Sequence, residues 1–303
     1  MKRVTVVINK WWECDPILFA LLNANACPAN LPWPTTLQSA RKRPNQNQLP
    51  PENPTPAPRA VFESKNTAAE VWCISDLLEH LPDKTALQSS SELKAKVLPK
   101  IFKFGSAPSL VIALGTAGLP NDASSENGNV VVGTKIFMHN AHPGGSNPDS
   151  NWSVGPFDQI IDSALPRSAF EAMIKVDWAS VSNRFLPVPN NQSVSNRSLV
   201  KHENVDLVTV NVTNYAEYAV TDLQIVAIFA KSGASGPPAS LETTHGLIRV
   251  QSDAPFLFIS GITDRLGHFD QEVTPRSYAQ NTAAAHNAGV VLAWLLPRID
   301  DVL

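Results

Sequence analysis

The sequence predicts an α/β protein in which strands and helices alternate around one sheet. Short β-branched runs such as Val4–Ile8 recur along the chain and have the composition of buried strands. Segments with helical periodicity separate them, and a long alanine-rich segment, Ser277–Leu296, predicts a final helix. The chain has no internal repeat and no clean change in composition, so we expect its 303 residues to form a single domain, residues 1–303.

Composition and charge exclude several classes of function. Apolar residues make up 43% of the chain and charged residues 17%, which is typical of a globular protein. The net charge of −3 predicts no nucleic-acid partner and no anionic membrane partner, and no window reaches the ~20 apolar residues of a membrane span. The first residues resemble a strand rather than a signal peptide. Three cysteines without CxxC spacing predict a cytoplasmic protein with no disulfide framework, metal or cofactor.

The first quarter of the chain predicts one helix, one insertion and one hairpin. The helix is expected over Pro16–Asn23, with proline in its first turn and Asp15 as its N-cap. Residues of about 27–58 are rich in proline and asparagine and predict a surface insertion, either a plain loop, a partner-binding arm or a lid. The strands of the hairpin are expected over Val61–Ser64 and Val71–Ser75.

A helix and two strands follow. Apolar spacing predicts a helix over Ser91–Phe104, bent by Pro99. A buried strand is expected over Leu110–Leu114, ending in a glycine turn at Gly115–Gly118, and another strand over Asn129–Phe137. The glycine turn could bring backbone N–H groups to a ligand, or could serve only as a tight turn.

The middle of the chain is less regular. Residues of about 144–204 predict a loop-rich insertion that contains one helix, Ala164–Ile174. A strand is expected over Val205–Val212, whereas Leu223–Phe229 fits strand or helix equally well. His139 and His142 have HxxH spacing but no acidic third ligand nearby, so we interpret them as loop residues and not as metal ligands.

The stretch from Ser240 to Asp264 places two acids around a buried strand. Glu242 precedes a short amphipathic segment, and the apolar run Pro255–Ile262 predicts a strand that ends at Thr263 and Asp264. Each acid alone could be a cap or first-turn carboxylate. Ligands in α/β sheets bind beyond the carboxyl ends of strands, so a shared site for the two acids is the competing interpretation.

Five segments, in order, carry a resemblance to a known family. They are LVIALGTAG (Leu110–Gly118), GNVVVGTKIFMHNA (Gly128–Ala141), SLETTHG (Ser240–Gly246), ISGITD (Ile259–Asp264) and the closing helix with NTAAAHNAGVVLAWLL. Together they resemble the nucleoside phosphorylase and nucleosidase superfamily, which contains purine nucleoside phosphorylases and methylthioadenosine/S-adenosylhomocysteine nucleosidases. The resemblance implies a three-layer α/β/α sandwich around a mixed central sheet.

The resemblance also implies roles for individual residues. Asp264 matches the acid that protonates the departing purine, and Glu242 matches the carboxylate that holds the ribose hydroxyls. Leu241 stands in place of the methionine that packs on the ribose, and Tyr215 matches an aromatic residue that stacks on the base. Glu13 lies near the position of a carboxylate that activates water.

Three further residues complete the predicted substrate site. Thr116 and Gly118 match the side of the site that faces the sugar and the leaving group, and Thr263 lies beside Asp264.

The sequence departs from the phosphorylases where those enzymes hold phosphate. The segment Cys14–Leu18 contains no arginine, and Ala113 stands where hexameric phosphorylases carry one. The second glutamate that follows the ribose-packing methionine in the family is also absent. A site without bidentate arginine is poorly suited to phosphate, which favours water as the nucleophile.

We therefore expect hydrolysis of the N-glycosidic bond of a purine nucleoside or a 5′-substituted derivative. A phosphorylase and a catalytically inactive nucleoside-binding protein on the same fold are the alternatives. The expected partners are a small-molecule nucleoside, water or phosphate as co-substrate, and further copies of the chain, because the family forms oligomers.

Overall fold

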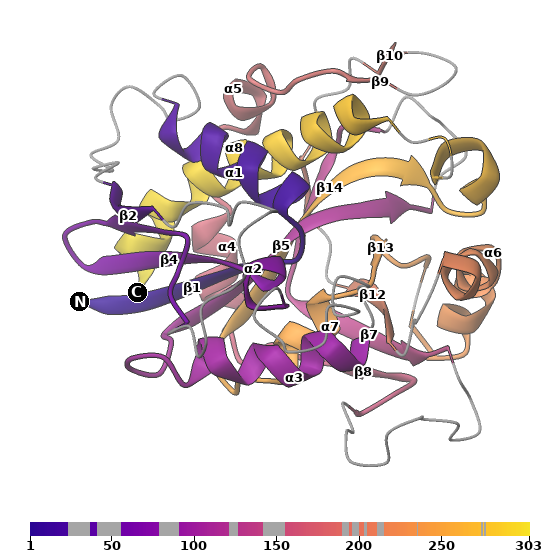
Figure 1. Cartoon of the computed structure of the whole chain (residues 1–303), viewed down its shortest axis with the longest axis horizontal. Coiled ribbons are helices and arrows are strands. Elements are labelled where there is room, and N and C mark those ends of the chain that lie inside the picture. The colour runs from indigo at the N-terminus through magenta and orange to yellow at the C-terminus, as the bar shows by residue number, and fades with distance from the viewer. Residues whose placement is uncertain are drawn as a thin grey trace, which may run out of the picture.

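Within the described residues, a mixed sheet of twelve strands forms the central layer of the computed structural model (Figure 1). The structure describes residues 1–23, 37–40, 56–78, 91–120, 127–141, 155–189, 194–195, 200–202, 205–210, 215–234, 236–273, 275 and 277–303. The sheet strands are β1 (Lys2–Ile8), β2 (Leu37–Ala40), β3 (Ala60–Glu63), β4 (Thr67–Cys73), β5 (Leu110–Leu119), β6 (Val130–Gly133), β7 (Lys135–Asn140), β8 (Gln159–Ile161), β11 (Val200–His202), β12 (Val205–Val210), β13 (Leu241–Glu242) and β14 (Phe256–Arg265). Parallel pairs such as β1–β4 and antiparallel pairs such as β13–β5 occur in the same sheet.

Helices cover both faces of this sheet (Figure 1). One face packs against α1 (Trp11–Leu22), α4 (Arg167–Met173), α5 (Trp178–Ser182) and α8 (Tyr278–Val302). The other face packs against α2 (Ile74–Leu78), α3 (Ser91–Phe102) and α7 (His245–Arg249). Alternation along β1 divides its side chains between the layers, with Val6 in the first core and Val7 in the second. The predicted three-layer α/β/α sandwich with a mixed sheet is confirmed.

Smaller elements lie at the margins of the sheet. The helix α6 (Tyr215–Ala230) covers a small apolar cluster formed with β7 and β13. The π-helix η3 (Phe269–Val273) follows the end of β14, and β9 (Val188–Pro189) pairs with β10 (Val194–Ser195).

The strand β5 changes its neighbour partway along its length. One edge pairs with β1 up to Leu114 and then with β13 at Gly118. The other edge pairs with β14 from Val111 to Leu119. On the first edge, the residues between Leu114 and Gly118 lie past the pairing with β1 and short of the pairing with β13. A side chain can therefore reach their backbone groups from this edge.

One predicted strand end is wrong. The glycine turn expected at Gly115–Gly118 is part of β5, whereas β14 ends at Arg265, next to the predicted end at Asp264. The two strands pair in parallel along this whole stretch, with one irregularity between Ile262 and Asp264. Buried backbone N–H and C=O groups require partners, and mutual pairing satisfies these groups although glycine favours turns.

Three other expectations about elements are corrected. The segment Asn129–Phe137 forms two strands, because β6 pairs with β14 whereas β7 pairs with β12. The first helix begins at Trp11, so Asp15 is not its N-cap but an exposed helical residue that accepts a hydrogen bond from Arg59. His139 lies in β7 and not in a loop.

Several expectations are confirmed. The strands β3 and β4 form the predicted antiparallel hairpin, α3 contains Pro99, and the hydroxyl of Ser277 caps α8 by accepting from the backbone N–H of Gln280 at 3.1 Å. The ambiguous segment Leu223–Phe229 is helical. In the part of the chain that the structure describes, no helix combines the length and the apolar character needed to span a membrane. Most of the proline-rich segment of about 27–58, and the residue His142, lie outside the described residues.

Candidate active site

Glu13, on α1, contacts β5 on the edge between Leu114 and Gly118, beyond the last residue of β5 that pairs with β1. Its Oε1 atom accepts hydrogen bonds from the backbone N–H and the hydroxyl of Thr116, each at 2.8 Å. Its Oε2 atom accepts from the backbone N–H of Lys10 at 3.0 Å, which fixes the carboxylate at the first turn of α1. The side chain is 4% exposed. Two backbone N–H groups and one hydroxyl therefore hold this buried carboxylate.

Glu242 lies at the start of α7 on the same side of β5. Its carboxylate accepts from the backbone N–H groups of Thr244 and His245, at 2.6 and 2.5 Å. A Cβ atom added at Gly115 would lie 3.0 Å from Glu13 Oε1 and 3.7 Å from His245 Nε2, so α1 and α7 meet beside this glycine. The capping interpretation of Glu242 therefore describes its hydrogen bonds.

Two lysines accompany these acids. The ammonium group of Lys94, on α3, donates to the hydroxyl of Thr244 at 2.9 Å and to the backbone carbonyl of Thr243 at 3.3 Å. Burial lowers the pKa of Lys94 to about 7, and Lys10 also lowers it, whereas Glu242 and Glu13 raise it. Burial likewise lowers the pKa of Lys10, against the attraction of Glu13. The α7 side of the site thus combines two buried acids with the buried Lys94 and the half-buried Lys10.

Asp264 lies on the other side of β5. It is 1% exposed, and one of its carboxylate oxygens accepts a hydrogen bond from the hydroxyl of Thr263. The other oxygen, Oδ2, lies 2.9 Å from the position that a Cβ atom would take on Gly118. Because side chains alternate along a strand, positions 115 and 118 face opposite sides of β5. Glycine at position 118 therefore leaves the room that the Asp264 carboxylate occupies.

The sheet register aligns several predicted residues across three adjacent strands. Gly118 on β5 pairs with Asp264 on β14 and with Leu241 on β13. The side chain of Leu241 packs in the apolar cluster under α6, and Glu242 points to the opposite face, toward α7. The contacts described for Glu242 and Asp264 thus lie on opposite faces of β5, and their shared contact with one ligand stays a prediction.

The remaining predicted residues have defined places. Thr263 is buried, and its backbone carbonyl accepts from the side chain of Gln280 on α8 at 2.6 Å. Tyr215 is the first residue of α6, and its side chain lies outside the described part of the structure.

Sequence reasoning missed Lys94 and Asp222, although both carry a signal. Lys94 precedes the buried residues Val97, Leu98 and Ile101 by three, four and seven positions, which places it on the buried face of α3. Asp222 precedes Ile225 and Phe229 by three and seven positions and is similarly buried on α6. A charged residue in phase with an apolar helical stripe is therefore the signal that identifies such groups.

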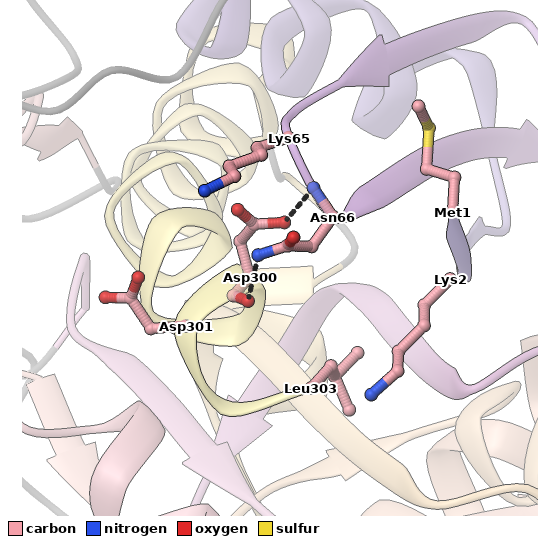
Figure 2. Close-up of a pocket in the computed structure, with 7 residues that line it drawn as sticks. All are labelled: Met1, Lys2, Lys65, Asn66, Asp300, Asp301 and Leu303. Atoms are coloured by element: carbon pink, nitrogen blue, oxygen red, sulfur yellow. Dashed lines mark hydrogen bonds between the residues drawn. The ribbon is translucent and has the colours of Figure 1, made fainter.

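A separate hollow of about 460 Å³ lies where the two chain termini meet, at the end of β1 away from Glu13. Figure 2 shows Asn66 hydrogen bonded to Asp300 at its rim. The carboxylate of Asp300 also accepts from the hydroxyls of Ser64 and Thr67, so it holds the β3–β4 turn against α8. No predicted site residue lines this hollow. Among the described residues, no three His, Cys, Asp or Glu side chains are grouped so that they could hold a metal ion.

Comparison with solved structures identifies the fold. Over 98% of this chain and 99% of the other, the protein is similar to the 5′-methylthioadenosine/S-adenosylhomocysteine nucleosidase of Neisseria meningitidis, with a TM-score of 0.50 and 14% identity. It is similar to the corresponding nucleosidase of Campylobacter jejuni over 100% of both chains (TM-score 0.53, 11% identity). It is also similar to the futalosine hydrolase of Helicobacter pylori over 97% of both chains (TM-score 0.51, 9% identity).

Sequence comparison adds nothing to this result. No protein-family model matches the chain, and no curated protein matches it. The Neisseria structure contains methylthio-immucillin-A, so that nucleosidase binds a small nucleoside analogue. At these low identities the structural likeness establishes the architecture alone: the chain shares the fold of these nucleosidases.

Proposed function

We propose that this protein is a nucleosidase that uses water to cleave the N-glycosidic bond of a purine nucleoside or a 5′-substituted derivative. The observation that carries the proposal is the double hydrogen bond from Thr116 to Glu13. The N–H and O–H donors of Thr116 are the groups that an anionic co-substrate would need, and a buried carboxylate takes both. A phosphate dianion would be repelled there, whereas a water molecule could be oriented by the same carboxylate.

In the proposed mechanism the bond between sugar and base breaks first and the sugar develops oxocarbenium character. Asp264 donates its proton to a nitrogen of the departing base, and Glu242 holds the ribose hydroxyls. Glu13 accepts a proton from the water that attacks the sugar carbon. Leu241, Tyr215, Thr116, Gly118 and Thr263 line the substrate. General acid or base assistance of this kind is typically worth about 10²–10⁴ in rate.

The test is a screen for free-base release with and without phosphate. The substrates are 5′-methylthioadenosine, S-adenosylhomocysteine, futalosine, adenosine and inosine, and chromatography detects the base and the sugar product. We expect release that does not depend on phosphate and yields the free sugar. Release that requires phosphate and yields a sugar 1-phosphate would overturn hydrolysis in favour of phosphorolysis.

A second candidate is a nucleoside-binding protein without activity. The observation that favours it is that both oxygens of Glu242 already accept backbone N–H groups, on the face of β5 opposite to Asp264. Calorimetry on the same five compounds separates the two functions. Saturable binding without release of base by the wild-type chain supports the binding protein and rejects the nucleosidase.

A further inference from the structure

Three carboxyl groups gather on the α6 side of β14. They belong to Asp222 of α6, Asp264 of β14 and Glu272 of η3, and their exposed fractions are 2%, 1% and 4%. Gathering buried acids is costly unless each has a cation, a set of donors or a proton.

Glu272 is accounted for by Arg265. Its Oε1 atom lies 2.6 Å from both Nε and Nη2 of Arg265, and its Oε2 atom accepts from the backbone N–H of the same residue at 2.8 Å. Two guanidinium nitrogens thus share one oxygen of this ion pair, and the main chain of Arg265 donates to the other. The charge of Glu272 is therefore compensated locally, and Arg265 is committed to it.

Asp222 has much less support. Its Oδ2 atom accepts from the backbone N–H of Gly267 at 2.7 Å. Its Oδ1 atom is buried and, among the described residues, has no hydrogen-bond partner and no cation beside it. A carboxyl oxygen in this position is satisfied most simply by a proton of its own, which would make it a donor. That donor needs an acceptor. The two acids whose charges act on Asp222 are Asp264 and Glu272, and Glu272 is already paired with Arg265, which leaves Asp264.

The turn after β14 ties Asp222 to Asp264. Gly267, which holds Asp222, follows Asp264 by three residues and has a positive φ of 79°. The backbone N–H of Leu266 donates to the carbonyl of Leu119 at 3.0 Å, so the turn is anchored to β5 on its other side. Two carboxyl groups held near each other in a dry site cannot both ionise without a large repulsion.

The raised pKa of Asp222 agrees with this geometry. Burial raises the pKa of Asp222 to about 7; the hydrogen bond from Gly267 lowers it, while Asp264 and Glu272 raise it. These two acids, with Arg265 on Glu272, are the charged groups that face Asp222 from β14 and η3. A carboxyl group with a pKa near neutrality can hold a proton at the pH at which an enzyme works.

We propose that Asp222 is a positioning residue for Asp264, and that the two buried carboxyl groups share one proton, which Asp264 delivers to the departing base. The proposal rests on the nucleosidase function for its catalytic part. As the bond from sugar to base breaks, the proton leaves the pair for a nitrogen of the base. The water that forms the new bond to the sugar carbon loses one proton, and return of that proton restores the pair.

The test combines a titration with an activity profile, using the full chain. Carbon-13 shifts of labelled aspartate carboxyl groups are followed from pH 4 to pH 9 in the wild type, Asp222→Asn, Asp264→Asn and the exposed control Asp301→Asn. We expect one carboxyl group of the wild type to titrate near pH 7 and to vanish in Asp222→Asn. In Asp264→Asn its pKa should fall by about one unit or more, because the paired charge is gone. Asp301→Asn should leave it unchanged.

The activity profile tests the positioning role. In Asp222→Asn we expect the alkaline limb of kcat to move to lower pH by about one unit, which lowers kcat about tenfold on that limb. A purely structural role would lower kcat equally at all pH values, and that result would overturn the positioning role. A wild type with no carboxyl group titrating between pH 6 and 8 would overturn the shared proton whatever the activity. If a carboxyl group of the wild type titrates near pH 7 but no base is released, the nucleosidase function is rejected and the proton-sharing pair is retained.

Discussion

The two sides of β5 bury their acids in different ways. On the α7 side, Glu13 and Glu242 accept hydrogen bonds from main-chain N–H groups, and Lys94 lies near both. On the α6 side, Arg265 compensates Glu272, whereas Asp222 has a single main-chain donor among the described residues. The first environment supplies several hydrogen-bond donors to its two acids, whereas in the second, burial and the neighbouring acids raise the pKa of Asp222.

This difference matches the two kinds of acidic group that the proposed reaction needs. Orienting water and holding hydroxyl groups require ionised carboxylates, whereas protonating a base requires an acid that is still protonated at neutral pH. A single strand that separates the two environments allows one fold to provide both.

Replacing the acid on the α6 side should have the largest effect on activity. We expect Asp264→Asn to lower kcat by about 10²–10⁴, because the amide cannot donate a proton to the base. The isosteric change should preserve the fold, as checked by circular dichroism and thermal unfolding, and Asp301→Asn is the matched exposed control. Unchanged base release by Asp264→Asn would reject the assignment.

Replacing the acid on the α7 side should have a smaller effect. In Glu13→Gln the amide oxygen can still accept from Thr116, but the charge that draws a proton from water is lost. We expect kcat to fall by about 10², with KM little changed, because Glu13 acts on water and not on the nucleoside. Glu171→Gln, an exposed residue of α4, serves as control. An increase in KM at constant kcat would instead indicate a role in substrate binding.

The buried lysine should affect stability rather than chemistry. The pKa of Lys94 is about 7 in the folded protein and close to its ordinary value when unfolded, so the unfolded chain binds more protons between these values. Stability from this residue therefore rises with pH from about 7 to 10, by at most about 1.4 kcal/mol per pH unit. Lys94→Met should remove this rise, as measured by urea unfolding at pH 7, 8 and 9.

The same experiment has a matched control on the same helix. Lys100→Met replaces an exposed lysine of α3 and should retain the slope of the wild type. If Lys94→Met also retained this slope, the lowered pKa of Lys94 would be contradicted, and with it this difference between the two sides of β5. Asp222 should contribute the opposite slope, because its raised pKa makes the folded chain bind more protons between about pH 4 and 7.

Sequence patterns predicted the architecture because apolar periodicity reports which faces are buried. The strand and helix patterns of Val4–Ile8, Ser91–Phe104 and Ser277–Leu296 reappear as β1, α3 and α8, each within a few residues. The prediction from local residue preference was wrong where pairing between distant strands decides the backbone conformation. Glycines at 115 and 118 indicated a turn, yet pairing with β14 keeps this segment extended.

The roles of the predicted site residues stay predictions. In the structure, Thr116 donates two hydrogen bonds to Glu13, and Gly118 lies against Asp264. Lys94 and Asp222 were missed because single charges within apolar stripes resemble ordinary solvated residues. Their burial depends on how α3 and α6 pack against the sheet, which a sequence pattern does not fix.

The change of neighbours along β5 has a consequence for how such a fold diversifies. Between Leu114 and Gly118 the sheet offers a main-chain donor that one helical side chain, that of Glu13, now satisfies. In the proposed reaction, the side chain at this one position on α1 selects the attacking molecule. Exchange of that one residue could redirect the chemistry while every layer of the protein stayed in place.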